Sequence, residues 1–342
     1  MNVRVKNKRR FGLWCIVFLL MFLNLIFAIN KRLSNDSTIS KKQKIALNYK
    51  VLAGDKDGSI TYSESKYFKK YIIDCKSNNS LVKWEEGKEY IDISLKKDEI
   101  KKLNIKVEES SENKDIYYDD SSNNLMIKIK KAYNENNFVN VDSNDAKKIV
   151  VLIAKEEKPF RATVVLDAGH GGEDKGASYN GLFEKDITLK IVNFTSEELM
   201  FNGFKVVKTR EKDELLYLNQ IAKIANEASA DLFVSVHINS NKIDKYKGVS
   251  AYYYDVNGFQ KDERIKLART IQKELIKNDN WEDRGIARES LSVLRNSEVP
   301  CVLLELGFIS NYEDRSKLMK DEVLKNFGIN ITKGVSNYFS AE

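Results

Sequence analysis

After Pro159 the sequence changes into short apolar runs that alternate with longer amphipathic stretches. Strands that alternate with helices are typical of an α/β domain, in which crossover helices join the strands of a largely parallel sheet. We therefore expect residues 158–342 to form an α/β fold with a mostly parallel, twisted sheet and helices on both faces. The pattern predicts strands at 164–166, 204–208, 232–236, 249–254, 291–294 and 301–304, and helices at 184–200, 215–228, 262–277, 314–320 and 322–339.

The chain has only two histidines, His170 and His237, and each lies just beyond the C-terminal end of a predicted strand. Glu184 begins a predicted helix, and Glu305 ends the last predicted buried strand. Taken singly, each residue suits a turn or a salt bridge. The carboxyl ends of strands in open α/β sheets gather ligands and catalytic groups, so the four side chains together indicate a site.

These residue types favour a metal site. Two imidazoles and a carboxylate suit Zn²⁺ and leave its fourth tetrahedral position to water, which is typical of catalytic rather than structural zinc. Imidazole and carboxylate also suit Mn, Fe or Co, whereas the lack of sulfur ligands disfavours softer metals. We predict one catalytic ion, preferably Zn²⁺, with His170, Glu184 and His237 as ligands and Glu305 as the spare carboxylate.

Residues 44–157 show alternation rather than helical periodicity. Apolar residues recur at every second position at 91–95, 105–107 and 125–129, and 149–153 is a final apolar run. Polar, turn-forming segments separate them. The pattern predicts half-buried strands in a small β-rich accessory domain.

One segment of this region is similar to the later part of a calcium-binding loop. Asp55, Asp57, Gly58 and Glu64 fall at its third, fifth, sixth and twelfth positions, where ligands and a tight turn are expected. Ala53 stands at the first position, which normally holds a carboxylate. The preferred interpretation is therefore an ordinary polar turn, with calcium binding as the alternative.

The N-terminal segment predicts a membrane anchor. Residues 11–29 are apolar and uncharged, long enough for a helix to cross the roughly 30 Å hydrocarbon core. Five basic residues precede this run and two follow it, which predicts a cytoplasmic N-terminus and an extracytoplasmic body. We expect residues 1–32 to be a basic tail and single-pass anchor, followed by a polar linker at 33–43. A cleaved signal peptide, which would give a secreted protein, is the alternative.

The same segment accounts for the formal net charge of +7. Residues 1–32 hold seven of the 57 basic residues and no acidic residue, which leaves 50 basic and 50 acidic residues in the rest of the chain. Domains that bind nucleic acid normally carry a basic stripe on their folded part. The neutral body argues against a nucleic-acid partner.

The segment VVLDAGHGGEDKGASYNGLFEKDITLKI, which starts at Val164, resembles the first motif of the zinc-dependent N-acetylmuramoyl-L-alanine amidases, the Amidase_3 family of cell-wall hydrolases. The resemblance covers about residues 160–340. Further similar motifs follow in the family's order: Thr209-Arg210 with Asp213, Ala225-Asn226, ADLFVSVHINS around His237, Gly248 before Tyr253 and Tyr254, and VLLELGFISN around Glu305.

The resemblance implies that His170, Glu184 and His237 are zinc ligands and that Glu305 is the catalytic carboxylate. It implies hydrolysis of the amide between N-acetylmuramic acid and L-alanine of peptidoglycan stem peptides, as in an autolysin. The chain departs from the family at Ile221, where an Arg is common, and at Ser250, two residues after Gly248, where a Glu is often found.

Two alternatives stay open. One is a membrane-anchored wall-binding or scaffold protein with an inactive amidase domain. The other is a zinc peptidase that cuts within the stem peptide. In each case the expected partner is peptidoglycan, and residues 44–157 are expected to help target the wall.

Overall fold

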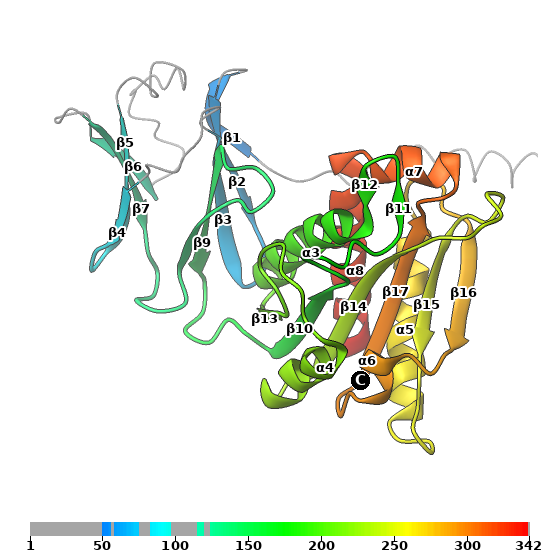
Figure 1. The fold of residues 1–342 in the computed structure, drawn as a ribbon. Coiled ribbons are helices and arrows are strands. Elements are labelled where there is room, and N and C mark those ends of the chain that lie inside the picture. The colour runs from blue at the N-terminus through cyan, green and yellow to red at the C-terminus, as the bar shows by residue number, and fades with distance from the viewer. Residues whose placement is uncertain (1–49, 56–57, 75–82, 97–114, 120–123, 341–342) are drawn as a thin grey trace, which may run out of the picture. The chain divides into compact units, whose positions relative to one another are not determined.

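A six-stranded sheet forms the centre of the C-terminal part (Figure 1). Its strand order is β13-β10-β14-β17-β15-β16. Neighbouring strands are parallel, except that β15 and β17 are antiparallel. The predicted α/β fold with a mostly parallel sheet is confirmed. The strands are β10 (Ala162–Ala168), β13 (Phe204–Lys208), β14 (Leu232–Asn239), β15 (Val249–Tyr253), β16 (Asp283–Arg288) and β17 (Cys301–Phe308).

Helices cover both faces of this sheet. Val164 and Leu166 of β10 pack in the core shared with α3, α5 and α8, whereas Val165 packs in the core shared with α4 and α6. This alternation follows from the period of two in a strand, because successive side chains point to opposite faces. The helices are α3 (Glu184–Phe201), α4 (Leu218–Glu227), α5 (Lys261–Leu275), α6 (Ser292–Arg295), α7 (Tyr312–Leu318) and α8 (Asp321–Ser340).

One predicted strand is wrong. Residues 291–294 do not form a strand, because Ser292–Arg295 is the short helix α6. A short apolar run has too few residues to distinguish a period of two from one of 3.6. The sixth strand is instead β16 at the edge of the sheet, whose mostly exposed sequence DRGIAR carries no apolar alternation.

The computed structural model describes residues 50–55, 58–74, 83–96, 115–119 and 124–340. The predicted anchor at 11–29 and the linker at 33–43 lie outside these residues, as does the predicted strand at 105–107. Within the described ranges, no helix combines the length and the apolar character needed to cross a membrane.

The β-rich accessory part forms two antiparallel sheets, which confirms the predicted strand content. One has the order β1-β2-β3-β9-β8 and the other β4-β5-β7-β6. Tyr71 and Ile73 of the first sheet share a buried core with Ile91, Ile93 and Ile127 of the second. The strands are β1 (Lys50–Asp55), β2 (Gly58–Glu64), β3 (Phe68–Asp74), β4 (Lys83–Glu86), β5 (Tyr90–Lys96), β6 (Ile116–Asp119), β7 (Asn124–Lys130), β8 (Phe138–Val141) and β9 (Lys148–Ala154).

The strand pairing rules out the calcium loop. Asp55, the last residue of β1, is paired with Gly58, the first residue of β2, whereas Glu64 is the last residue of β2. Six steps along a strand span about 20 Å, so Asp55 and Glu64 cannot share one ion. Glu64 instead accepts a hydrogen bond from Tyr62 and forms an ion pair with Lys155.

A buried group of charges joins β3 to the C-terminal end of α3. The Lys70 ammonium lies 3.1 Å from a Glu197 oxygen and 2.9 Å from a Glu198 oxygen. Burial alone would lower the pKa of Lys70, but the two carboxylates outweigh it and hold the pKa above its usual range. Beside them Ser65 Oγ donates to the Phe201 carbonyl at 2.5 Å. The accessory part therefore contacts the helix that carries a predicted metal ligand.

Lys70→Ala is expected to lower the free energy of unfolding by about 3 kcal/mol, because it leaves two largely buried carboxylates without their cation. Urea denaturation at pH 7 measures this change. Lys190→Ala is the matched control, since it breaks the exposed Lys190–Asp321 pair and should cost less than about 1 kcal/mol. Equal losses in the two variants would contradict the prediction.

The effect of Lys70→Ala should also depend on pH. Burial alone would raise the pKa of Glu198, but the charge of Lys70 outweighs it and holds the pKa below the ordinary 4.5. The stability contributed by a lowered carboxyl pKa is present above the unfolded value and is lost as the pH falls through the folded value. The difference in stability between wild type and variant should therefore shrink below about pH 4.5.

Candidate metal centre

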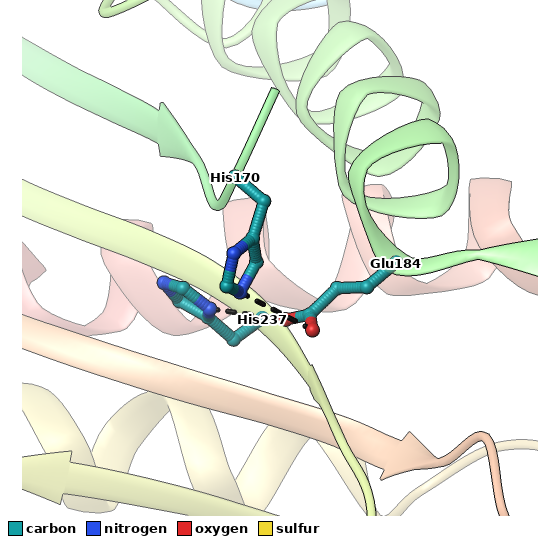
Figure 2. Close-up of side chains that lie close together, drawn as sticks. All are labelled: His170, Glu184 and His237. Atoms are coloured by element: carbon teal, nitrogen blue, oxygen red, sulfur yellow. Dashed lines mark hydrogen bonds and ion pairs between the residues drawn. The ribbon is translucent and has the colours of Figure 1, made fainter. Parts of the chain in front are cut away.

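The three predicted ligands lie together at the carboxyl edge of the sheet. His170 lies in the loop after β10, Glu184 is the first residue of α3, and His237 lies in β14, which extends beyond its predicted end. Figure 2 shows both imidazoles pointing toward the Glu184 carboxylate. The shortest separations are 3.2 Å from His170 Nε2 to Glu184 Oε2 and 3.0 Å from His237 Nδ1 to Glu184 Oε1. One ligand atom from each residue lies within 4.8 Å of the others.

Glycines allow this close approach. His170 itself has a positive φ of 64°, a conformation that is uncommon for residues other than glycine. A Cβ at Gly169 would collide with the His237 ring, and a Cβ at Gly176 would collide with the His170 ring and the Glu184 carboxylate. The Gly-rich loop therefore gives the backbone the room that the three side chains need.

The Glu184 carboxylate is held from both sides. The backbone N–H of Ala177 donates to Oε2 at 2.7 Å, and that of Ile238 donates to Oε1 at 2.8 Å. Burial alone would raise the pKa of Glu184, but hydrogen bonds and charge from His170 and His237 outweigh it and lower the pKa to about 2. Glu184 is therefore ionised at neutral pH, as a metal ligand must be.

Asp174 orients His170, a role that our sequence analysis missed. His170 Nδ1 lies 2.8 Å from Asp174 Oδ2, which leaves Nε2 facing Glu184. Burial alone would lower the pKa of His170, but Glu184 and then Asp174 outweigh it and raise the pKa to about 9. Metal-binding histidines commonly donate their second ring N–H to a carboxylate in this way. An acid four residues after a histidine in a Gly-rich loop was the available signal.

Glu305 lies beside this group but outside it. It lies within β17, directly paired in register with His237 of β14. In the described part of the chain its buried Oε2 has no hydrogen-bond partner. Burial raises the pKa of Glu305 to about 7, with the nearby His237 opposing this rise. A carboxyl group with such a pKa can both accept and return a proton near neutral pH.

The donor set fits the predicted ion. Two imidazole nitrogens and one carboxylate, with a carboxylate orienting one imidazole, match the ligands and outer partners of catalytic zinc sites. Asp167, near the C-terminal end of β10, has a structural role. It is buried and accepts hydrogen bonds from Thr209 and Ser235, which ties β10 to β14 and to the segment after β13.

Comparisons with known proteins found a matching family model and similar sequences. Residues 164–337 match the family model described as N-acetylmuramoyl-L-alanine amidase. The chain is 37% identical to the uncharacterized protein YqiI of Bacillus subtilis over 177 residues, which are 52% of this chain and 84% of YqiI. It is 35% identical to the N-acetylmuramoyl-L-alanine amidase LytC of the same organism over 199 residues, which are 58% of this chain but only 40% of LytC.

The chain is also similar to a solved structure. The crystal structure of N-acetylmuramoyl-L-alanine amidase from Clostridium difficile 630 aligns with a TM-score of 0.50 and 30% sequence identity. The alignment covers 53% of this chain and 98% of that one.

Proposed function

The chain belongs to the Amidase_3 family of N-acetylmuramoyl-L-alanine amidases. We therefore propose that it cleaves the amide between N-acetylmuramic acid and L-alanine in peptidoglycan. The observation that carries this proposal is the convergence of His170, Glu184 and His237 beside Glu305. An inactive scaffold would have no need to retain all four groups at one edge of the sheet.

We propose that His170, Glu184 and His237 hold one Zn²⁺. When bound, zinc lowers the pKa of a water molecule toward about 7 and polarises the carbonyl of the scissile amide. Asp174 fixes the ring of His170 so that Nε2 faces the site. The backbone amides that hold Glu184 keep its carboxylate in place.

Glu305 is proposed as the general base and then the general acid. It takes a proton from the attacking water and returns it to the nitrogen of L-alanine as the amide bond breaks. One carboxylate can serve both steps because its pKa lies near 7, so neither protonation state is strongly disfavoured. The position of Glu305 beside His237, outside the three-residue group, supports this division of roles.

Mass spectrometry of the products tests the proposed reaction. The full chain is incubated with purified peptidoglycan, and the soluble and insoluble products are analysed. An amidase releases intact stem peptides with a free L-alanine amino group and leaves glycan without peptide. A peptidase that cuts within the stem would leave shortened peptides on the glycan. Absence of any released peptide would favour the scaffold alternative.

We propose an extracytoplasmic location for the catalytic part, as suits an enzyme that acts on the cell wall. Residues 11–29 are proposed as the tether, and the accessory sheets are proposed to contact the wall. Protease treatment of intact spheroplasts is expected to digest the body of the protein and to leave a protected N-terminal fragment in the membrane. Recovery of the undigested chain would contradict the location, and loss of the fragment would contradict the tether.

Asp174→Ala is expected to weaken zinc binding by about 10–100-fold, because His170 loses the carboxylate that sets its ring orientation. Titration against a chelator of known affinity measures the change. Glu173→Ala is the matched control, since it removes an exposed carboxylate from the neighbouring position. An Asp174→Ala protein that binds zinc as tightly as the control would show that Asp174 does not orient the ligand.

A further inference from the structure

Three polar side chains form a row across neighbouring strands of the sheet. The register pairs His237 of β14 with Glu305 of β17, and pairs Glu305 in turn with Ser250 of β15. Directly paired residues on antiparallel strands have side chains on the same face, with Cβ atoms about 4.5–5.5 Å apart. Ser250 is therefore the neighbour of Glu305 on the side away from His237.

The surrounding apolar residues agree with this orientation. The next directly paired residues on the same face are Leu303 and Tyr252, two positions along each strand, and both pack in the core shared with α4 and α6. Val249 and Ala251, on either side of Ser250, pack in the core on the opposite face. Alternation along β15 thus leaves the Ser250 hydroxyl on the face that carries Glu305.

Ser250 and Glu305 each bury a side-chain oxygen that has no hydrogen-bond partner among the described residues. Ser250 is only 4% exposed, and in the described part of the chain neither its Oγ nor Glu305 Oε2 has a hydrogen-bond partner. Native proteins satisfy nearly all buried polar atoms, so each exception calls for an explanation, such as a catalytic role or an ordered water molecule. Two such exceptions on directly paired residues indicate one shared polar position rather than two separate packing defects.

We propose that Ser250 is a positioning residue for Glu305, an inference that rests on the proposed amidase function. During turnover its hydroxyl hydrogen-bonds the Glu305 carboxyl group, either directly after a small side-chain rotation or through one water molecule. This contact holds the carboxyl group toward the scissile amide.

A hydroxyl suits this position because Glu305 changes protonation state in each cycle. A hydroxyl can donate to the carboxylate before proton transfer and can accept from the carboxylic acid afterwards. One serine therefore keeps the same side chain in place in both halves of the reaction. An apolar side chain of the same size would provide packing but no directed contact.

The test compares Ser250→Thr with Ser250→Val. These variants have the same shape and differ only in the hydroxyl group, so any strain from the added methyl group is common to both. The measurement is kcat and KM for release of stem peptide from a soluble muropeptide, together with zinc content. We expect the Val variant to have a kcat about tenfold lower than the Thr variant, with KM within about twofold and zinc content unchanged.

A third variant, Ser250→Ala, tests the same role if the methyl group added by Thr or Val disturbs the sheet. It adds no atom, and we expect a kcat about tenfold below wild type with wild-type zinc content and thermal stability. Thr332→Val is the matched control. Thr332 is also buried, and its hydroxyl is likewise without a partner within the described ranges, but it lies on α8 against the opposite face of the sheet. Its removal should leave kcat unchanged.

The outcomes separate the two proposals. Equal kcat values for the Thr and Val variants, or a wild-type kcat for Ser250→Ala, would overturn the positioning role and leave the amidase function intact. A rise in KM as large as the fall in kcat, together with reduced zinc content, would indicate a structural role for Ser250. That result would also overturn the positioning role. If the wild-type chain released no stem peptide, the proposed function would fail and this inference would fail with it.

Discussion

Glu305→Gln should retain bound metal and lower kcat by about 10²–10⁴-fold, the usual contribution of a general acid–base group. The amide has nearly the shape of the carboxyl group but cannot accept a proton from water. Glu305 lies outside the group of three side chains that converge on one point, so metal content should not change. Stem-peptide release and elemental analysis on the same preparation measure both quantities.

Glu227→Gln is the control for this change. Glu227 forms an exposed ion pair with Lys223 on α4, so the same substitution can be made there, away from the site. That variant should keep wild-type kcat and metal content. A Glu305→Gln protein with full activity would show that another group accepts the proton. Loss of metal from it would instead show that Glu305 is a ligand, and the division of roles would then be wrong.

The sequence predicted the sheet wherever strands are buried. The strand at 204–208 matches β13 at both ends, because the apolar run begins directly after the turn residues Asn202 and Gly203. Where a strand lies at the edge this signal disappears. β16 has mostly exposed side chains, and so nothing in its composition distinguished it from a loop.

Some features of the site could likewise be predicted from the sequence pattern, and others could not. That His170, Glu184 and His237 lie close together could be predicted because each was expected at the carboxyl edge of the sheet, where such side chains gather. The contact of Asp174 with His170 depends on the left-handed backbone conformation at His170, which the sequence pattern does not predict. The pairing of Ser250 with Glu305 depends on the register between antiparallel strands, and a shift of one residue would place Ser250 on the other face.

His237→Ala is expected to weaken zinc binding by about 1000-fold or more, since it removes one of three protein ligands from a site whose binding free energy is on the order of 10 kcal/mol. The loss should exceed that of Asp174→Ala, because that change only releases the orientation of a ligand that remains. Elemental analysis after gel filtration and chelator competition measure the two affinities on one scale.

Folding must be separated from metal binding in this variant. The His237 ring fills the space beside Gly169, so its removal leaves a cavity that lowers stability by itself. The useful measurement is therefore the shift of the unfolding temperature on addition of zinc. A ligand that binds only the native state stabilises it by an amount that grows with the logarithm of the ratio of ligand concentration to Kd, so wild type should show a shift that His237→Ala lacks. An equal shift in both proteins would mean that zinc binds elsewhere, and the assignment of all three ligands would then be wrong, since the three side chains form one group.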